Sequence, residues 1–89
     1  MRSLLTADTD HCYYCGRPKK MMHTVFSMTE QQDRASREDG TFIPVCWECN
    51  VKLHLSQKMQ RQLYIEGQIA WERTYPMLVF EKRYGRNFL

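Results

Sequence analysis

Four cysteines in two C-x-x-C pairs are the residues of this chain best suited to chemistry. The first pair is Cys12 and Cys15, and the second, after thirty intervening residues, is Cys46 and Cys49. Each pair directs two thiolates toward one point, and two pairs complete the tetrahedral sulfur site that zinc prefers. We therefore predict a structural Zn²⁺ at these four residues, with no open coordination position for catalysis. His11 is an alternative ligand, although four thiolates already fill the shell.

Three further residues near the cysteines suit a second kind of chemistry. Asn50 and His54 are four residues apart, so on a helix that opens at Cys49 their side chains lie on one face. His23 lies in an apolar stretch after the first cysteine pair. A histidine opposite two metal-capable side chains suits metal-assisted phosphodiester cleavage, because it can activate water while the metal stabilises charge on the phosphate.

Each of these residues also has an ordinary structural role open to it. His23 can be a histidine at the edge of the core, and Asn50 can cap the helix start. His54 can be an exposed helix residue or a substitute zinc ligand. The neighbouring Met21 and Met22 are typical packing residues.

The elements that must position these residues indicate a small α+β fold. Residues 1–11 are predicted as a loose leader, and HCYYCGRP as a tight turn that a glycine and a proline end. Residues 21–28 are predicted as a short strand and residues 29–40 as an exposed loop or short solvated helix. Residues 41–45 form a second short strand, with Pro44 at an edge or at its end. One cysteine pair on a turn and one at a helix start is the treble-clef arrangement.

The rest of the chain is predicted to be helical. Leu55, Met59 and Leu63 recur at four-residue steps. Gly67 weakens or breaks this helix and Pro76 ends it.

Residues 77–85 are predicted as a last short helix that Gly85 closes. Four aromatic residues are predicted to be core and to hold this tail against the zinc end: Trp71, Tyr75, Phe80 and Tyr84.

Composition and charge exclude several classes of protein. The 89 residues form one predicted domain, 1–89, and a hydrophobic fraction of 43% is ordinary for a globular chain. No apolar run approaches the roughly 20 residues that span a membrane, and no signal peptide is recognisable. We expect a reduced, cytoplasmic setting, where cysteine pairs bind metal. The net charge of +3 comes entirely from residues 58–89, which suits a phosphate-rich partner or simply a solvated helix face.

Two stretches, CYYCGRPKKMMH and IPVCWECNVKLH, resemble the zinc-containing HNH endonucleases of phages and prophages, also called ββα-metal or His-Me finger nucleases. Those enzymes have C-x-x-C-G, a histidine that closes the first strand, a variable loop, and a second C-x-x-C followed by histidine or asparagine. The resemblance covers residues 11–55 and leaves residues 56–89 as a helical basic tail. It implies that His23 is the general base and that Asn50 and His54 help to hold a catalytic Mg²⁺ or other divalent ion, inside a bacterial host cell.

Met22 departs from this family pattern. Family members place aspartate, glutamate or histidine immediately before the base, as a metal ligand, whereas methionine is a soft thioether that Mg²⁺ does not accept. Asp33, Glu38 or Asp39 would have to reach in from the loop to replace it.

Three functions are therefore predicted. The first is a metal-dependent endonuclease that acts on DNA. The second is a non-catalytic zinc module, which binds DNA or RNA through Arg17, Lys19, Lys20 and the basic tail, or binds a host protein as a regulator. The third is a zinc-held adaptor that presents its aromatic tail to another protein. No membrane or small-molecule partner is expected.

Overall fold

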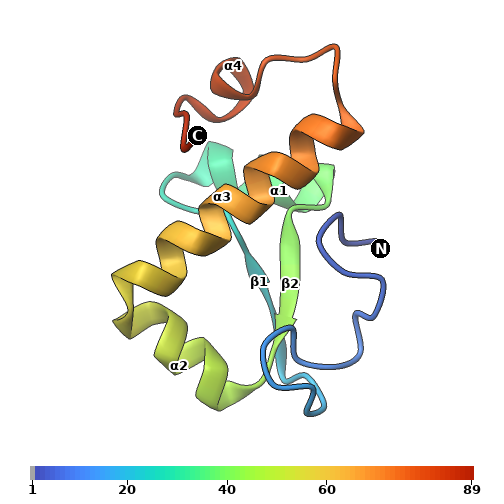
Figure 1. The fold of residues 1–89 in the computed structure, drawn as a ribbon, viewed down its shortest axis with the longest axis vertical. Helices are drawn as coiled ribbons and strands as arrows, with labels where there is room; N and C mark the ends of the chain where they lie inside the picture. Colours follow the sequence, from blue (N-terminus) through green and yellow to red (C-terminus); the bar gives the residue numbers. More distant parts are fainter. Residues whose placement is uncertain (1) are drawn as a thin grey trace.

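Two short antiparallel strands lie at the centre of the fold, and one helix is inserted between them (Figure 1). The computed structural model describes residues 2–89, so Met1 of the predicted leader lies outside the described residues. The α+β fold class is confirmed. In chain order the elements are β1 (Met21–Thr24), α1 (Glu30–Asp39), β2 (Phe42–Val45), α2 (Trp47–Leu55), α3 (Gln57–Thr74) and α4 (Phe80–Tyr84).

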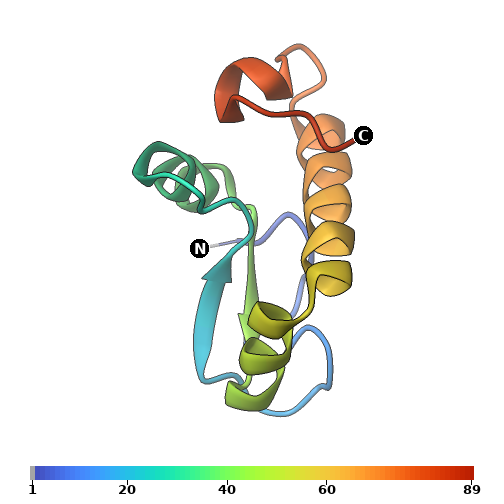
Figure 2. The same ribbon diagram turned by 90° about the vertical axis from the view of Figure 1, so that its left-hand side faces the viewer.

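The helices surround this hairpin on different sides. Figure 2 shows α3 running along one side of the strands, with α1 on the other side at their upper end. In Figure 1, α2 lies at the lower end of the hairpin and α4 at the upper end, close to the C-terminus. The register pairs Met21 with Val45 and Thr24 with Phe42, so the cysteine pairs lie near the end of the hairpin opposite to α1.

The N-terminal leader is held in place more firmly than a loose segment would be. Ser3 Oγ donates to the Phe42 carbonyl at 2.5 Å, and the Leu4 N–H donates to the Gly40 carbonyl at 2.8 Å. Further along, the Tyr13 N–H donates to the Pro44 carbonyl at 2.8 Å. These bonds satisfy backbone groups on the outer edge of β2, which would otherwise be unpaired.

The first predicted strand is shorter than expected, because the sheet ends at Thr24 rather than at residue 28. Val25 and Phe26 turn into the core, where both are buried. The Phe26 ring packs against four aromatic rings from the C-terminal part of the chain, so residues 56–89 are an integral part of the core: Tyr64, Phe80, Tyr84 and Phe88.

The polar segment 29–40 forms a helix, which confirms one of the two predicted alternatives. One face of this helix is buried, so the expectation that the segment is solvated was wrong. Thr29 caps its start by accepting from the Gln32 N–H at 3.1 Å, and Gly40 ends it in the left-handed conformation that glycine favours. Ser36 is buried because its hydroxyl bonds both backbone groups of Phe26, at 3.0 and 3.1 Å. Non-local backbone partners therefore allow polar side chains to be buried here.

The predicted continuous helix after the cysteines is in fact two helices. α2 begins at Trp47 with Cys46 as its N-cap, and it ends at Leu55. Ser56 has an extended backbone and caps α3, because its hydroxyl accepts from the Met59 N–H at 3.1 Å. Leu55 is 82% exposed, so the apparent four-residue periodicity crossed a break in the helix.

Gly67 does not break α3, which runs without interruption from Gln57 to Thr74. Its role is to let the hairpin approach. A Cβ atom at this position would lie 2.9 Å from Val25 Cγ1 and 3.0 Å from Phe26 Cζ. The helix therefore tolerates glycine because a larger residue would collide with the core.

Gly67→Ala is expected to destabilise the protein although alanine is the better helix former. The gain in helix propensity is about 1 kcal/mol, whereas overpacking a core contact costs about 1–3 kcal/mol. Urea unfolding of the zinc-loaded protein would measure the change in midpoint. Combining the substitution with Val25→Ala should restore part of the loss, because it removes the nearest atom. A rise in stability for the single variant would contradict this account.

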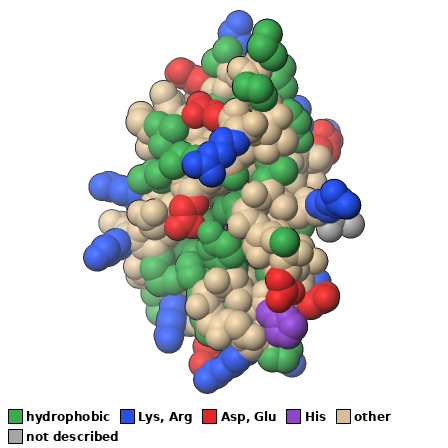
Figure 3. Space-filling view, turned by 45° about the vertical axis from the view of Figure 1, so that its right-hand side comes forward, with side chains coloured by type: hydrophobic (Ala, Val, Ile, Leu, Met, Phe, Trp, Pro, Cys, Tyr) green, Lys and Arg blue, Asp and Glu red, His purple; other side chains and the backbone are tan. Residues whose placement is uncertain are grey.

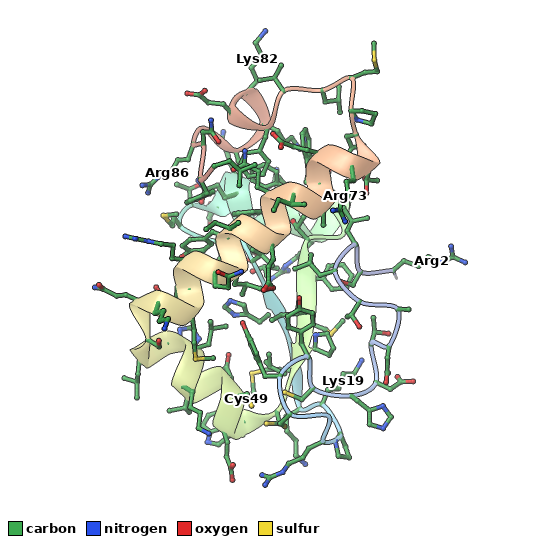
Figure 4. The ribbon with its side chains drawn as sticks, viewed as in Figure 1. Arg2, Lys19, Cys49, Arg73, Lys82 and Arg86 are labelled. Carbon is green, nitrogen blue, oxygen red and sulfur yellow. The ribbon has the colours of Figure 1, made fainter. Side chains whose placement is uncertain are left out.

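The predicted aromatic core forms, but at the end of the fold away from the cysteines. Trp71, Phe80 and Tyr84 are buried and Tyr75 is partly buried. In Figure 4, Cys49 lies toward the lower end of the molecule and Lys82 of α4 at the top. The expectation that these rings hold the tail against the zinc end was therefore wrong, because they pack on α1 and the end of the hairpin.

Asp39 is the polar centre of this upper end. Its Oδ2 accepts from Trp71 Nε1 at 2.8 Å and from the Tyr84 hydroxyl at 2.9 Å, and its Oδ1 accepts from Arg83 Nη2 at 2.9 Å. Burial alone would raise the pKa of Asp39, but the hydrogen bonds from Arg83, Trp71 and Tyr84 outweigh it and lower the pKa. The carboxylate thus joins α1, α3 and α4.

Asp39→Ala is expected to cost about 2–4 kcal/mol of stability, because it removes a charged acceptor and leaves the buried Trp71 indole N–H without a partner. The Tyr84 hydroxyl would keep only its contact with Thr41 Oγ1 at 3.2 Å. Glu38→Ala is the matched control: Glu38 also binds Arg83, at 3.1 Å, but it is exposed to solvent. Its loss should cost no more than about 0.5 kcal/mol. Urea unfolding would compare the two variants, and equal effects would show that Asp39 contributes only a surface ion pair.

The last helix is shorter than predicted and spans only Phe80–Tyr84. Gly85 ends it as expected, with φ of 75° and its N–H donating to the Glu81 carbonyl at 2.7 Å. Three exposed apolar residues precede it: Met77, Leu78 and Val79. The face in Figure 3 shows hydrophobic side chains at this upper end, while its lysine and arginine side chains are scattered over the face and its edges.

Candidate metal centre and histidine pair

The four cysteines converge at the end of the hairpin opposite to α1. Their Sγ atoms all lie within 4.8 Å of one another, and those of Cys15 and Cys46 are 3.5 Å apart. Four sulfurs bound to one Zn²⁺ at about 2.3 Å would be about 3.8 Å apart. The cluster therefore has close to the dimensions that a tetrahedral zinc site requires, and the donor set fits that metal.

The local backbone explains why each cysteine pair converges. In the first pair, the chain reverses at Gly16, whose φ is +78° and whose N–H donates to the Cys12 carbonyl at 3.0 Å. The predicted tight turn is thus confirmed. In the second pair, Cys46 is the N-cap of α2, and its Sγ accepts from the Cys49 N–H at 3.4 Å. A helix start also favours the negative charge of bound thiolates.

The pKa values show how crowded the four thiols are. Burial opposes ionisation of Cys12, but backbone hydrogen bonds, chiefly from Cys46 and Cys15, lower its pKa to about 6. Burial and the neighbouring thiols raise the pKa of Cys49 to about 12. Because neighbouring thiolates repel one another, a divalent cation would be needed for all four thiols to ionise together.

His11 and His54 do not take part in this cluster. The only group of three or more histidine, cysteine, aspartate or glutamate side chains with metal-binding spacing in residues 2–89 is the cysteine quartet. His11 is exposed and its Nδ1 lies 2.9 Å from Asp8 Oδ2. Both substitute-ligand alternatives therefore lack support in the geometry.

His23 and His54 meet at a second place, between the hairpin and the junction of α2 with α3. Their ring centroids are 5.6 Å apart and the rings are nearly perpendicular, at 86°. Both line a cavity of about 160 Å³. Burial, and secondarily the charge of His54, lower the pKa of His23, so its imidazole is neutral and able to accept a proton at pH 7. The other lining residues are Val25, Ser27, Leu53, Gln60, Leu63 and Tyr64.

Asn50 lies one helical turn before His54 but does not line this cavity. It is half-buried, and its backbone N–H donates to the Cys46 carbonyl at 3.0 Å. The alternative that Asn50 caps the helix was wrong, since Cys46 occupies the N-cap position. The structure therefore brings two of the three candidate catalytic residues together at one cavity.

The three carboxylates considered as replacements for Met22 are engaged elsewhere. Asp33 accepts from Thr24 Oγ1 at 2.6 Å and pairs with Arg37 at 3.1 Å. Glu38 and Asp39 bind Arg83 at the far end of the fold. Mg²⁺ prefers oxygen ligands, so two imidazoles do not fit it, whereas a borderline ion such as Ni²⁺ or Zn²⁺ accepts imidazole readily.

Two neighbours of the histidine pair could not be identified from any sequence motif. Gln60 Nε2 donates to the carbonyls of Leu53 and His54, at 3.0 and 3.2 Å, and so fixes the end of α2. Tyr64 closes the cavity from α3. Neither residue belongs to a motif. Both lie in α3, and the turn at Ser56 brings that helix to the cavity, so their position depends on the tertiary structure.

Comparison with known proteins leaves the site to be interpreted from its own geometry. None of the helices in residues 2–89 combines the length and the apolar character that crossing a bilayer requires. No protein-family model, curated protein or solved structure matches this chain.

Proposed function

We propose that this chain is a zinc-stabilised, HNH-like protein of treble-clef type that acts on nucleic acid and hydrolyses phosphodiester bonds. The observation that supports this most is the contact between His23 and His54, which line one cavity. Both residues stand at positions of the motif resemblance, and a neutral histidine beside a second imidazole suits hydrolysis of a phosphodiester. The cysteine quartet supplies the scaffold and takes no part in the reaction.

In this mechanism His23 is the general base. Its neutral imidazole takes a proton from a water molecule as the water oxygen attacks the phosphorus atom, and the bond from phosphorus to the leaving oxygen breaks. His54, which is exposed at the same cavity, faces the phosphate side. A divalent ion held there with phosphate oxygens would supply positive charge for the transition state. Asn50 is proposed to support this side of the site from the preceding turn of α2.

The test is cleavage of plasmid and branched DNA by zinc-loaded protein, with Mg²⁺, Mn²⁺ or Ni²⁺ added, beside the His23→Ala variant. Cleavage by the wild type that the variant loses would support the proposal. Because the site offers imidazole rather than carboxylate, we expect Ni²⁺ to support more activity than Mg²⁺ or Mn²⁺. Absence of cleavage with every ion and substrate would reject the nuclease.

A second candidate is a zinc module that binds DNA or RNA without cutting it. One specific observation favours it: no carboxylate lines the cavity of the histidine pair among the residues that the structure describes. In that case the wild type would bind nucleic acid, and His23→Ala would bind it equally well. Regulation of a host protein, in the cytoplasm of a phage-infected cell, is the corresponding alternative if nucleic acid does not bind.

A further inference from the structure

We propose that Trp47, flanked by Arg17 and Lys20, is a stacking site for an unpaired base of single-stranded nucleic acid. This surface, the Trp47 platform, lies at the cysteine end of the molecule and is separate from the cavity of the histidine pair. The inference rests on the proposed function in one respect, that the partner is a nucleic acid. It does not require that the chain cleaves it.

The exposure of Trp47 is the first observation. Trp47 is 63% exposed, whereas the other tryptophan, Trp71, is 1% exposed and forms part of the core. A tryptophan that makes so little use of its apolar surface for folding is available to a ligand, and indole is the largest flat face a side chain offers. Trp47 borders a surface cavity of about 280 Å³ whose other lining residues are Arg17, Pro18, Lys20, Cys46 and Glu48.

The backbone beneath the platform is rigidly held. Trp47 is the first residue of α2 and directly follows Cys46 of the metal cluster. The Arg17 carbonyl accepts from the Cys12 N–H at 2.6 Å, and the Lys20 N–H donates to the Val45 carbonyl at 2.9 Å. Both flanking cations are therefore placed by the same cysteine-bearing turns, which reduces the ordering that binding would require.

Two cations beside the indole, Arg17 and Lys20, can contact a phosphate backbone. Arg17, Lys19 and Lys20 are exposed within four positions of one another. The exposed Glu48 carboxylate pairs with Arg17 at 3.0 Å, but an ion pair in solvent contributes little and can open for a phosphate. An aromatic face beside cations is the arrangement by which proteins bind single strands without sequence preference.

The basic residues of the tail do not make a comparable surface. In Figure 4 the side chains of Arg73, Lys82 and Arg86 project in three different directions, while Lys19 lies at the same end as Cys49. On the face in Figure 3 the cations are likewise dispersed. Charge and an exposed aromatic ring coincide at the Trp47 platform, which is why we assign the base contact there.

The test is binding of a short oligothymidylate, measured by quenching of tryptophan fluorescence and by anisotropy of a labelled strand. The background is zinc-loaded His23→Ala, so that cleavage does not interfere. Base stacking is worth about 1–3 kcal/mol, so Trp47→Ala should weaken binding by about 5- to 150-fold. Trp47→Phe should retain most of the affinity. Leu55→Ala is the matched control, because Leu55 is an exposed apolar residue of the same helix.

An abasic strand of equal length separates stacking from charge. The parent protein and its Trp47→Ala variant should bind the abasic strand equally. Arg17→Gln should weaken the binding of both strands and reduce its salt dependence. Equal binding of oligothymidylate by Trp47→Ala and its parent would overturn the inference, as would preference for duplex over single strand. If binding depends on Trp47 but the protein with His23 intact does not cleave DNA, the proposed hydrolysis is rejected and the platform is retained. If the protein with His23 intact cleaves DNA but Trp47→Ala leaves binding unchanged, the platform is rejected and the proposed hydrolysis is retained.

Discussion

Removal of zinc by a strong chelator is expected to unfold this protein. A chain of 89 residues buries only about 60% of the surface its unfolded form exposes, so its core alone gives little stability. Structural Zn²⁺ contributes roughly 10–16 kcal/mol of apparent binding free energy in small zinc domains, which equals or exceeds the whole stability of a typical domain. Here the cluster joins the turn that carries Cys12 and Cys15 to the start of α2. Without a bound ion, this cross-link between the two cysteine pairs is lost.

Near-ultraviolet circular dichroism during chelator titration, with metal content measured in parallel, would follow this loss. Cys49→Ser should behave like the stripped protein, because a buried ligand of the cluster is missing. His11→Ala is the control and should keep one zinc per chain, since His11 is bonded to Asp8 and lies outside the cluster. A folded, stable protein without metal would reject the zinc scaffold.

His23→Ala is expected to lower the rate of DNA cleavage by about 10²- to 10⁴-fold, the range that a general base contributes. The fold should survive, because His23 is only partly buried and does not belong to the cysteine cluster. The rate would be measured by plasmid nicking with Ni²⁺ or Mn²⁺, at equal zinc content for all proteins.

Two comparisons make this result specific. His54→Ala should also reduce cleavage, because its ring contacts His23 at the same cavity. His11→Ala removes an exposed histidine beside the cysteines and should leave the rate unchanged. An unchanged rate in His23→Ala would exclude it as the base, whatever the effect at His54.

The cysteine cluster was the part of the structure most accessible from sequence. The two cysteines of a C-x-x-C pair converge through the backbone geometry of four consecutive residues. The spacing alone therefore predicts the local structure. The chain reversal at Gly16, directly after the first cysteine pair, could be predicted for the same reason, because it depends only on neighbouring residues. The α+β class and Gly85 as a helix end were predictable for related reasons, since each depends on neighbours in the chain.

Contacts between distant residues could not be predicted in this way. Gly67 looked like a helix breaker, yet its role depends on Val25 and Phe26, about forty positions earlier. The turn at Ser56, which was not predicted, has a larger effect on the histidine site. It directs α3 back across the hairpin, so the cavity forms at the C-terminal end of α2, beside His54 and away from Asn50.

The placement of the aromatic tail shows the same limit. Hydrophobicity identified the rings as core, but their partner is Asp39 at the end of α1. A carboxylate in a polar stretch ordinarily indicates solvent exposure. Its three donors come from α3 and α4, and only the tertiary fold brings them to it.

The close approach of Cys15 and Cys46 has a consequence for the redox state of the chain. Their sulfurs lie 3.5 Å apart, and Cys15 is exposed to solvent. An oxidant such as hydrogen peroxide can convert one thiolate to a sulfenic acid. The second thiol then attacks the sulfenic sulfur, the S–S bond forms, and the hydroxyl group leaves as water. That bond would consume two of the four ligands at once. The same proximity that builds the metal site thus makes metal binding and thiol oxidation mutually exclusive, and a bound cation protects these sulfurs from oxidation.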